Sequence, residues 1–379
     1  MRRRETKERG WWRSAGERTH ALPSTENQSS VACVQRIVIA KPGSWSALVL
    51  DQAPEVHSPG PHQVVVNTSY SGVNFADVVA RQGLYESANK QVGYPMCLGF
   101  EWSGRVAAVG ANVHDLAPGD QVFGVSRFGA YASQLLLDRR FVFRLPRGFS
   151  LAQAAAFPVA FLTAYYGLFE LGAAKAGQAV LVHSAAGGVG GALAQLARAK
   201  GCRVFGVVGS AHKVDAARAF GCEAVAVKPE GSRSWVADAK AFAPNGFEVV
   251  LDANGAETLR ASYNLLGTPG RLVIYGFHSM FRRGGGRTDW LRLAWQWLRT
   301  PRFDPLRMTN DNKAVFGFNL SYLFDESELL ERAMTEFLGG IERGELRAPP
   351  VTEVPAAEAG RAHQTLESGT TVGKVVLRW

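Results

Sequence analysis

Clustered cysteines are lacking from this chain. Its 379 residues include four cysteines, Cys33, Cys97, Cys202 and Cys222, and none forms a C-x-x-C pair. A disulfide framework or a structural zinc lobe would need thiols close together in the sequence. We therefore expect neither, and the cysteine usage is typical of a reducing compartment such as the cytoplasm.

Long apolar runs are lacking as well. No stretch reaches the roughly 18 uninterrupted apolar residues that span a bilayer. The basic residues 2–4 are not followed by an apolar run, so the sequence does not predict a secretory signal. Residues 1–34 are rich in Arg, Ser and Glu, and we expect them to form a disordered N-terminal extension.

Acidic residues are outnumbered by basic ones. The chain has 42 Lys and Arg against 33 Asp and Glu, a net charge of +9. This balance favours anionic partners: phosphorylated cofactors, acidic membranes or nucleic acid. No nucleic-acid-binding motif is present, so we expect no nucleic-acid partner.

The hydrophobic pattern changes twice along the chain. Residues 35–155 hold short, β-branched runs cut by Gly and Asp, which predicts a β-rich domain. Residues 156–311 begin with a helical stretch and continue as strand-plus-helix units, which predicts a parallel sheet. Residues 312–379 end in the strand-like GKVVLRW, and we expect them to return to the first domain. The predicted fold class is α/β.

The segment VLVHSAAGGVGGALAQLARAKG contains a glycine cluster between a predicted strand and a predicted helix. Here a strand meets a helix at the carboxyl edge of a parallel sheet, where helix N–H groups attract a pyrophosphate. A Cβ at Gly187 would hold the phosphate away, and one at Gly190 would separate helix from strand. Ala185 replaces the first glycine of the usual fingerprint. The context still predicts a dinucleotide-binding Rossmann domain.

The next strand, RVFGVVG, has no carboxylate at its end. A site that prefers NAD usually has Asp or Glu there for the ribose 2′-hydroxyl. This chain has Ser210, followed by Lys213. A hydroxyl and an ammonium suit a 2′-phosphate, so we predict NADP(H). The alternative is that Lys213 is an ordinary solvated lysine.

Five segments occur in a family-specific order: NTSYSGVNFADVVARQGLY, LGFEWSGRVAAVG, GDQVFGV, FLTAYYGL and VHSAAGGVG. The sequence from about residue 35 resembles the medium-chain dehydrogenase/reductase superfamily and its zinc-free quinone oxidoreductase branch. Within that branch it is similar to the vesicle amine transport protein homologues. The resemblance implies a GroES-like substrate domain before the Rossmann domain, and a homodimer.

Zinc-dependent members of this superfamily supply three ligands at positions that correspond to Asn74, Phe100 and Val159 here. These side chains are poor ligands or none at all, so we predict no metal. The resemblance then implies direct hydride transfer from NADPH to a quinone or an α,β-unsaturated carbonyl.

Two residues are candidate catalytic groups. The amide of Asn74 can donate a hydrogen bond to a substrate oxygen, although Asn74 also suits a turn after Gly72. The phenol of Tyr85 can donate a hydrogen bond or a proton, or it forms an aromatic wall of the pocket. Asp77 is expected to hold the local loop.

The resemblance also implies a set of cofactor contacts. A lysine occupies a position where the family often has tyrosine, at Lys228. The predicted cofactor-binding residues are Thr163, Ala186, Gly187, Gly188, Val189, Gly190, Ser210, Lys213, Lys228, Gly276, Phe277, Asn319 and Lys374. A surface role for Lys374 remains an alternative.

The segment 287–302 combines tryptophans with arginines. Trp290, Trp297 and Leu298 recur at helical spacing, Asp289 is a plausible N-cap, and Pro301 ends the segment. Such a helix can lie in a membrane interface. Alternatively, its tryptophans pack on the cofactor domain or in a dimer contact.

Two hypotheses follow for the whole protein. The first is a zinc-independent, NADPH-dependent reductase of quinones or enones. The second is a membrane-peripheral protein that binds NADPH with little turnover.

Overall fold

The structure is a computed structural model, and it describes residues 33–56, 58–229, 232–281 and 286–379. Cys33–Trp379 form one compact unit. Of the predicted N-terminal extension 1–34, residues 1–32 lie outside the described residues. Its last two residues belong to the first strand, β1, which begins at Cys33.

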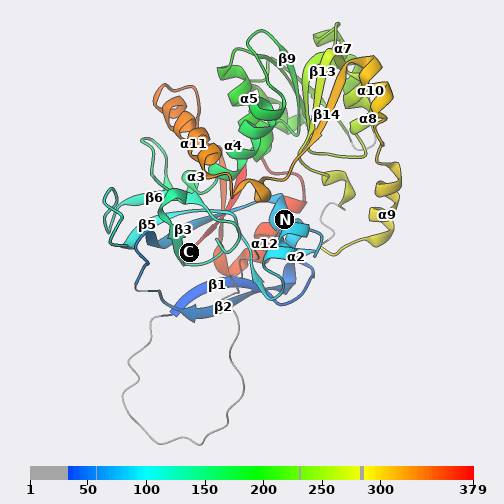
Figure 1. Ribbon diagram of the computed structural model, residues 1–379. Coiled ribbons are helices and arrows are strands. Elements are labelled where there is room, and N and C mark those ends of the chain that lie inside the picture. The colour runs from blue at the N-terminus through cyan, green and yellow to red at the C-terminus, as the bar shows by residue number, and fades with distance from the viewer. Residues whose placement is uncertain (1–32, 57, 230–231, 282–285) are drawn as a thin grey trace, which may run out of the picture. The chain divides into compact units, whose positions relative to one another are not determined.

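A six-stranded parallel sheet forms the centre of the second half of the chain (Figure 1). This arrangement confirms the predicted Rossmann-type sheet. Its last strand follows residue 311, so the sheet extends beyond the segment 156–311. The strands, in spatial order, are β11 (Ala224–Val227), β10 (Arg203–Val208), β9 (Ala179–His183), β12 (Phe247–Asp252), β13 (Leu266–Ile274) and β14 (Lys313–Gly317).

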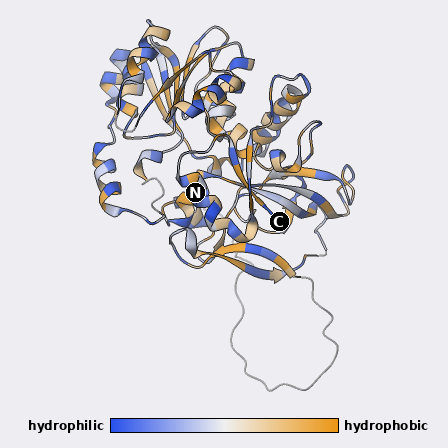
Figure 2. Cartoon of the chain, turned by 180° about the vertical axis from the view of Figure 1, so that it is seen from behind, coloured by the Kyte–Doolittle hydropathy of each residue, from blue (hydrophilic) through white to orange (hydrophobic). Residues whose placement is uncertain are grey.

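Helices cover both faces of this sheet because its strands are apolar on both sides. Val180 and Val182 of β9 belong to a cluster with α4 (Pro158–Tyr165) and α5 (Gly188–Ala199). The alternate residue, Leu181, belongs to a cluster with α7 (Trp235–Phe242) and α8 (Leu259–Asn264). This alternation follows from the two-residue period of a strand, and Figure 2 shows the strands predominantly apolar.

The β-rich domain contains a seven-stranded sheet and a smaller three-stranded one. The last strand of the chain, β16, pairs with β3 of the first domain. The larger sheet consists of β15 (Val351–Pro355), β16 (Lys374–Arg378), β3 (Gln63–Val73), β5 (Glu101–Val109), β6 (Gln121–Val125) and β8 (Val142–Arg144), with β7 (Gln134–Asp138) also on β3. The smaller sheet consists of β2 (Leu48–Pro54), β1 (Cys33–Ile39) and β4 (Met96–Cys97).

The apolar stretch Leu151–Leu171 links the two domains. Its length and composition would suit a membrane span, but 72% of the relevant window is buried inside the protein, as expected for a core helix. Pro158 interrupts it, as predicted, and is the first residue of α4. The rings of Phe157 and Phe161 stack with centroids 3.8 Å apart, in a cluster that includes residues of both domains.

The remaining helices lie around these sheets. The predicted helix in segment 287–302 is confirmed as α9, and the Asp289 side chain caps it by accepting from the backbone N–H of Arg292. These helices are α1 (Phe75–Arg81), α2 (Glu86–Gln91), α3 (Leu151–Ala154), α6 (Val214–Phe220), α9 (Trp290–Arg299), α10 (Pro305–Asp311), α11 (Ser327–Glu342) and α12 (Ala359–Glu367).

Candidate active site

The glycine-rich turn joins β9 to α5. Gly187 is the N-cap of α5 and provides no side-chain cap, so the first N–H groups of the helix lack an intrahelical partner and can bind an anion. A Cβ on Gly190 would lie 2.1 Å from the carbonyl oxygen of Ser184. Glycine at 190 is therefore required for the close approach of helix and strand. The turn fits a dinucleotide pyrophosphate.

The end of the chain packs against this turn. The N–H of Gly373 donates to the carbonyl oxygen of Ala186 at 3.0 Å. A Cβ on Gly188 would lie 2.6 Å from Cδ of Lys374. The predicted contacts Ala186, Gly188 and Lys374 are therefore brought together, and Val189 lies in the first turn of the same helix.

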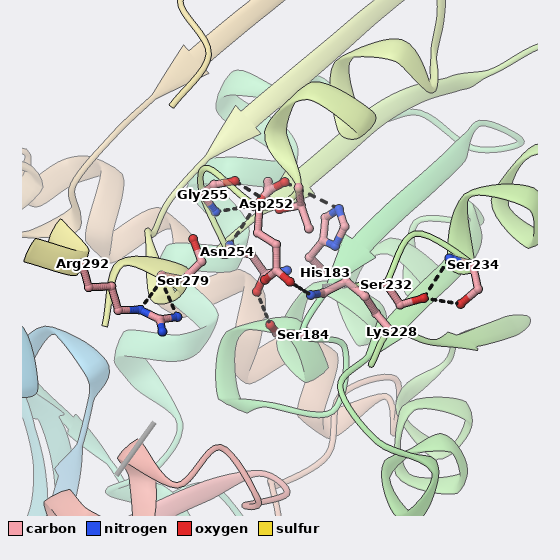
Figure 3. A network of polar contacts seen from close by, with 12 residues as sticks. His183, Ser184, Lys228, Ser232, Ser234, Asp252, Asn254, Gly255, Ser279 and Arg292 are labelled. Atoms are coloured by element: carbon pink, nitrogen blue, oxygen red, sulfur yellow. Dashed lines mark hydrogen bonds and ion pairs between the residues drawn. The ribbon is translucent and has the colours of Figure 1, made fainter. Parts of the chain in front are cut away.

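A buried carboxylate organises the loop that follows β12 (Figure 3). One oxygen of Asp252 accepts from the backbone N–H groups of Asn254 and Gly255, at 2.8 and 3.1 Å. The other oxygen accepts from the hydroxyl of Ser262 at 2.8 Å. The hydroxyl of Ser184 donates to the Asn254 side chain at 3.2 Å, so this loop is tied to the glycine turn. Our sequence analysis did not single out Asp252.

The residues predicted for the 2′-phosphate lie after β10. The Ser210 hydroxyl is 3.2 Å from Nδ1 of His212. The ammonium of Lys213, an intermediate-exposure side chain, donates to the carbonyl oxygen of Gly369 at 2.6 Å. Both residues lie at the carboxyl end of a strand next to β9, where the adenosine half of a dinucleotide is expected.

The predicted phosphate contact Lys228 is buried and not solvated. It follows β11, its side chain is buried, and its Nζ lies 2.9 Å from Oε1 of Glu257. A tyrosine at this position would offer an aromatic face, whereas Lys228 offers a charge that Glu257 already balances. Its contact with the cofactor stays a prediction.

Three further predicted residues lie after β13 and in α4. Gly276 and Phe277 follow β13, and the Phe277 side chain is 39% exposed. A Cβ on Gly255 would lie 2.7 Å from Cδ1 of Phe277, so the ring packs directly on the loop held by Asp252. The hydroxyl of Thr163 donates within α4 to the carbonyl oxygen of Val159 at 2.7 Å.

The side chains of Asn74, Glu101 and Lys374 form a buried polar cluster. The ammonium of Lys374 lies 2.8 Å from Oε1 of Glu101, and it donates to Oδ1 of Asn74 at 2.7 Å and to the carbonyl oxygen of Val73 at 2.8 Å. The amide nitrogen of Asn74 donates to Oε1 of Glu101 at 2.9 Å. All three protons of Lys374 therefore have oxygen partners, which accounts for its burial. We call these side chains the Lys374 cluster.

Glu101 is the member of this cluster that sequence analysis missed. Its other oxygen, Oε2, accepts from the backbone N–H of Val159 at 2.9 Å, in the first turn of α4. A carboxylate stabilises a helix N-terminus, so Glu101 serves both the cluster and the helix. The only available signal was its place directly after Phe100, a position equivalent to a zinc ligand.

Asp77 holds the local loop, as predicted. Its carboxylate accepts from the backbone N–H groups of Asn74 and Gly99, each at 2.8 Å. Burial raises the pKa of Asp77 to about 7, although these hydrogen bonds and the nearby Lys374 act in the opposite direction. The bond to Asn74 fixes the start of α1 and hence the direction of the Asn74 side chain.

The second candidate catalytic group, Tyr85, contacts the predicted cofactor residue Asn319. The phenol donates to Oδ1 of Asn319 at 2.6 Å, and Oδ1 also accepts from the hydroxyl and backbone N–H of Ser321, at 2.9 and 3.0 Å. Burial raises the pKa of Tyr85, so the phenol keeps its proton. Its ring also packs edge-on against Phe100, with centroids 6.0 Å apart.

These features define a two-domain oxidoreductase with a dinucleotide-binding sheet and a GroES-like substrate domain. Residues 60–147 match the model of the alcohol dehydrogenase GroES-like domain, and residues 188–333 match that of the zinc-binding dehydrogenases. The chain is 32% identical to the synaptic vesicle membrane protein VAT-1 homolog of Homo sapiens, over 90% of this chain and 85% of that protein. It belongs to the medium-chain dehydrogenase/reductase superfamily.

Other comparisons agree with this family. The VAT-1 homolog of Danio rerio is 32% identical over 83% of this chain, which spans 64% of that relative's length. The Escherichia coli quinone oxidoreductase complexed with NADPH is 28% identical, with a TM-score of 0.76, over 91% of this chain and all of that one. CurK enoyl reductase is 25% identical, with a TM-score of 0.75, over 91% of this chain and 99% of that one.

The name of the zinc-binding family raises the question whether this site fits zinc. Phe100 and Val159 are buried hydrocarbon side chains, and Oδ1 of Asn74 and Oε1 of Glu101 are hydrogen-bonded to the ammonium of Lys374. Within the part of the chain that the structure describes, no group of three His, Cys, Asp or Glu side chains could hold a metal ion. The side chains at the three ligand positions do not fit zinc.

The Lys374 cluster predicts a large stability effect. The change Lys374→Met would leave Glu101 buried without its cation, which typically costs about 3–5 kcal/mol. Urea unfolding should show this loss, and the double change Lys374→Met/Glu101→Gln should recover part of it. The exposed Lys90 is the control, since Lys90→Met should leave the unfolding midpoint unchanged. Equal midpoints for Lys374→Met and the parent protein would contradict this account.

Proposed function

We propose that this protein is an NADPH-dependent reductase of quinones or α,β-unsaturated carbonyl compounds. The observation that carries the proposal is the position of the Lys374 cluster, which joins the glycine turn to Asn74. A dinucleotide seated on that turn would thus lie next to a preorganised amide. The E. coli quinone oxidoreductase with NADPH and CurK enoyl reductase, both similar to this chain, support NADPH and this substrate class.

The bound dinucleotide would supply the hydride, and the chain's own groups would orient and polarise the acceptor. Asn74 has two amide protons, and Glu101 accepts one of them. We propose that the second donates to the carbonyl oxygen of the substrate, where negative charge develops. Because Lys374 and Glu101 fix the Asn74 amide, this side chain needs little reorientation when the substrate binds.

We propose that Tyr85 and Asn319 form the opposite side of this pocket. Three hydrogen bonds to Oδ1 fix Asn319, and we propose that its amide nitrogen faces the cofactor or the substrate. Tyr85 keeps its proton. It can donate this proton to the reduced substrate if the phenol gives up its hydrogen bond to Asn319 and forms one with the substrate instead. Phe277, on the strand edge, would flank the nicotinamide.

The reductase hypothesis is tested by NADPH oxidation at 340 nm. We expect turnover with ortho-quinones, para-quinones or small enones, faster with NADPH than with NADH, and unchanged by a chelator. Asn74→Ala should lower kcat by about 10²-fold, the usual cost of removing one donor to a developing oxyanion. The exposed Asn264 provides the control, Asn264→Ala.

Either of two results would oppose this account. No turnover across the panel, despite saturable NADPH binding, would favour the second hypothesis of a binding protein. Loss of activity with the chelator would mean that Asn74, Phe100 and Val159 had been misinterpreted.

A specific observation favours the second candidate function, a membrane-peripheral role. No residue of α9 is buried, and the exposed fractions of Trp290, Leu291 and Trp297 are 69%, 86% and 61%. The tryptophans are therefore not buried in the core of the cofactor domain, and a dimer contact stays an alternative prediction. Figure 1 shows α9 at the edge of the ribbon, away from both large sheets.

We propose that α9 contacts an anionic membrane, with the protein otherwise in the cytoplasm. The parent protein should sediment with phosphatidylglycerol vesicles, and Trp290→Ala/Trp297→Ala should abolish this because tryptophan anchors at the lipid interface. Val49→Ala, which alters an exposed apolar residue elsewhere, is the control. Failure of the parent protein to sediment would exclude the membrane role.

We also propose a homodimer. Among the described strands, β14 pairs only with β13, so its other edge can pair with a second copy. Light scattering should give a mass near twice the chain mass of 41.0 kDa. Val315→Pro, which places proline in this edge strand, should shift the mass towards the monomer. A monomeric parent protein would refute the dimer.

A further inference from the structure

A cavity of about 620 Å³ lies beside the end of α9, outside the candidate active site. Four arginines line it: Arg233 before α7, Arg260 in α8, Arg299 at the end of α9, and Arg302. Its lining does not include the glycine turn, Asn74, or the predicted phosphate contacts Ser210, Lys213 and Lys228. We call this cavity the arginine pocket.

The charge in the arginine pocket is strongly one-sided. Among the lining residues that the structure describes, Glu257 is the only acidic one, and Oε1 of Glu257 lies 2.9 Å from Nζ of Lys228. Four like charges around one cavity repel each other, and a bound anion would relieve that repulsion.

The wall formed by residues 298–302 is held in place by packing. The ring of Phe303 packs on Tyr263 of α8, with centroids 5.3 Å apart. The hydroxyl of Thr300 donates to the carbonyl oxygen of Gln296 at 2.8 Å. The wall is therefore preorganised, which reduces the entropy lost when a ligand binds.

Two of the guanidinium groups are also oriented. The guanidinium of Arg299 lies 5.8 Å from the ring centroid of Trp295. The guanidinium of Arg302 lies 5.6 Å from the ring centroid of Trp297. Stacking on an aromatic face restricts a long side chain. The planar fork of arginine then suits two phosphate oxygens at once.

We propose that the arginine pocket binds a phosphate-bearing ligand at a site separate from the dinucleotide site. The volume is in the range of small-molecule sites, and the arginines match phosphate rather than an uncharged quinone. The phosphate comes either from a soluble organophosphate or from the headgroup of a lipid under α9. This inference does not depend on the proposed reductase activity.

The test is calorimetric titration with inorganic pyrophosphate in the presence of saturating NADPH, so that the dinucleotide site is filled. We expect saturable binding that weakens with salt. Arg260→Gln/Arg299→Gln should weaken it by about tenfold or more, because two charge-assisted contacts are lost. The control Arg147→Gln/Arg347→Gln removes the same charge from exposed positions outside the pocket, and should bind like the parent protein.

The outcomes separate the proposal from its alternatives. If phosphatidylglycerol vesicles displace pyrophosphate from the parent protein, the ligand is a lipid headgroup; if they do not, it is a soluble organophosphate. No binding under saturating NADPH, or equal binding by the two double variants, would overturn the proposal. Circular dichroism and NADPH affinity of Arg260→Gln/Arg299→Gln provide the check on folding.

Discussion

The buried ammonium of Lys374 is the interaction on which the arrangement of this site depends. Lys374 belongs to the last strand, its aliphatic part packs on Gly188, and its charge is shared by Asn74 and Glu101. Glu101 in turn holds the first turn of α4. One cation therefore joins the closing strand, the glycine turn, the start of α1 and the helix that links the domains. Burying it is favourable only because every one of its protons has an oxygen partner.

A second buried ion pair positions α9. Arg81 pairs with Glu367, and its guanidinium also donates to the carbonyl oxygen of Gly286 at 3.0 Å. Within α9 itself, the guanidinium of Arg292 donates to the carbonyl oxygen of Ser279 at 3.1 Å. The segment that carries α9 is thus attached to the substrate domain before the helix and to the Rossmann domain within it. This double attachment presents the tryptophans outward and places Arg299 beside the arginine pocket.

Much of the fold followed from local patterns. The strand period of two, the helix period, and glycine at 187 and 190 predicted the parallel sheet and its turn, since these depend on backbone sterics and neighbouring residues. The same reasoning found the N-cap Asp289 and the break at Pro158. It ended the sheet domain at residue 311, before β14, because β14 is a short strand of only five residues. Its assignment depends on pairing with β13, which no local pattern encodes.

The sequence by itself determined the fold class, the dinucleotide turn and the absence of ligand chemistry at Phe100 and Val159, because each depends on residue type at a given spacing. The tertiary structure alone decided that Lys374 meets Asn74 across 300 positions of the chain, that Tyr85 meets Asn319, and that Lys228 is balanced by Glu257. It also decided that the tryptophans of α9 face outward. Burial and the pairing of distant charges are properties of the packed chain, so no spacing rule could supply them.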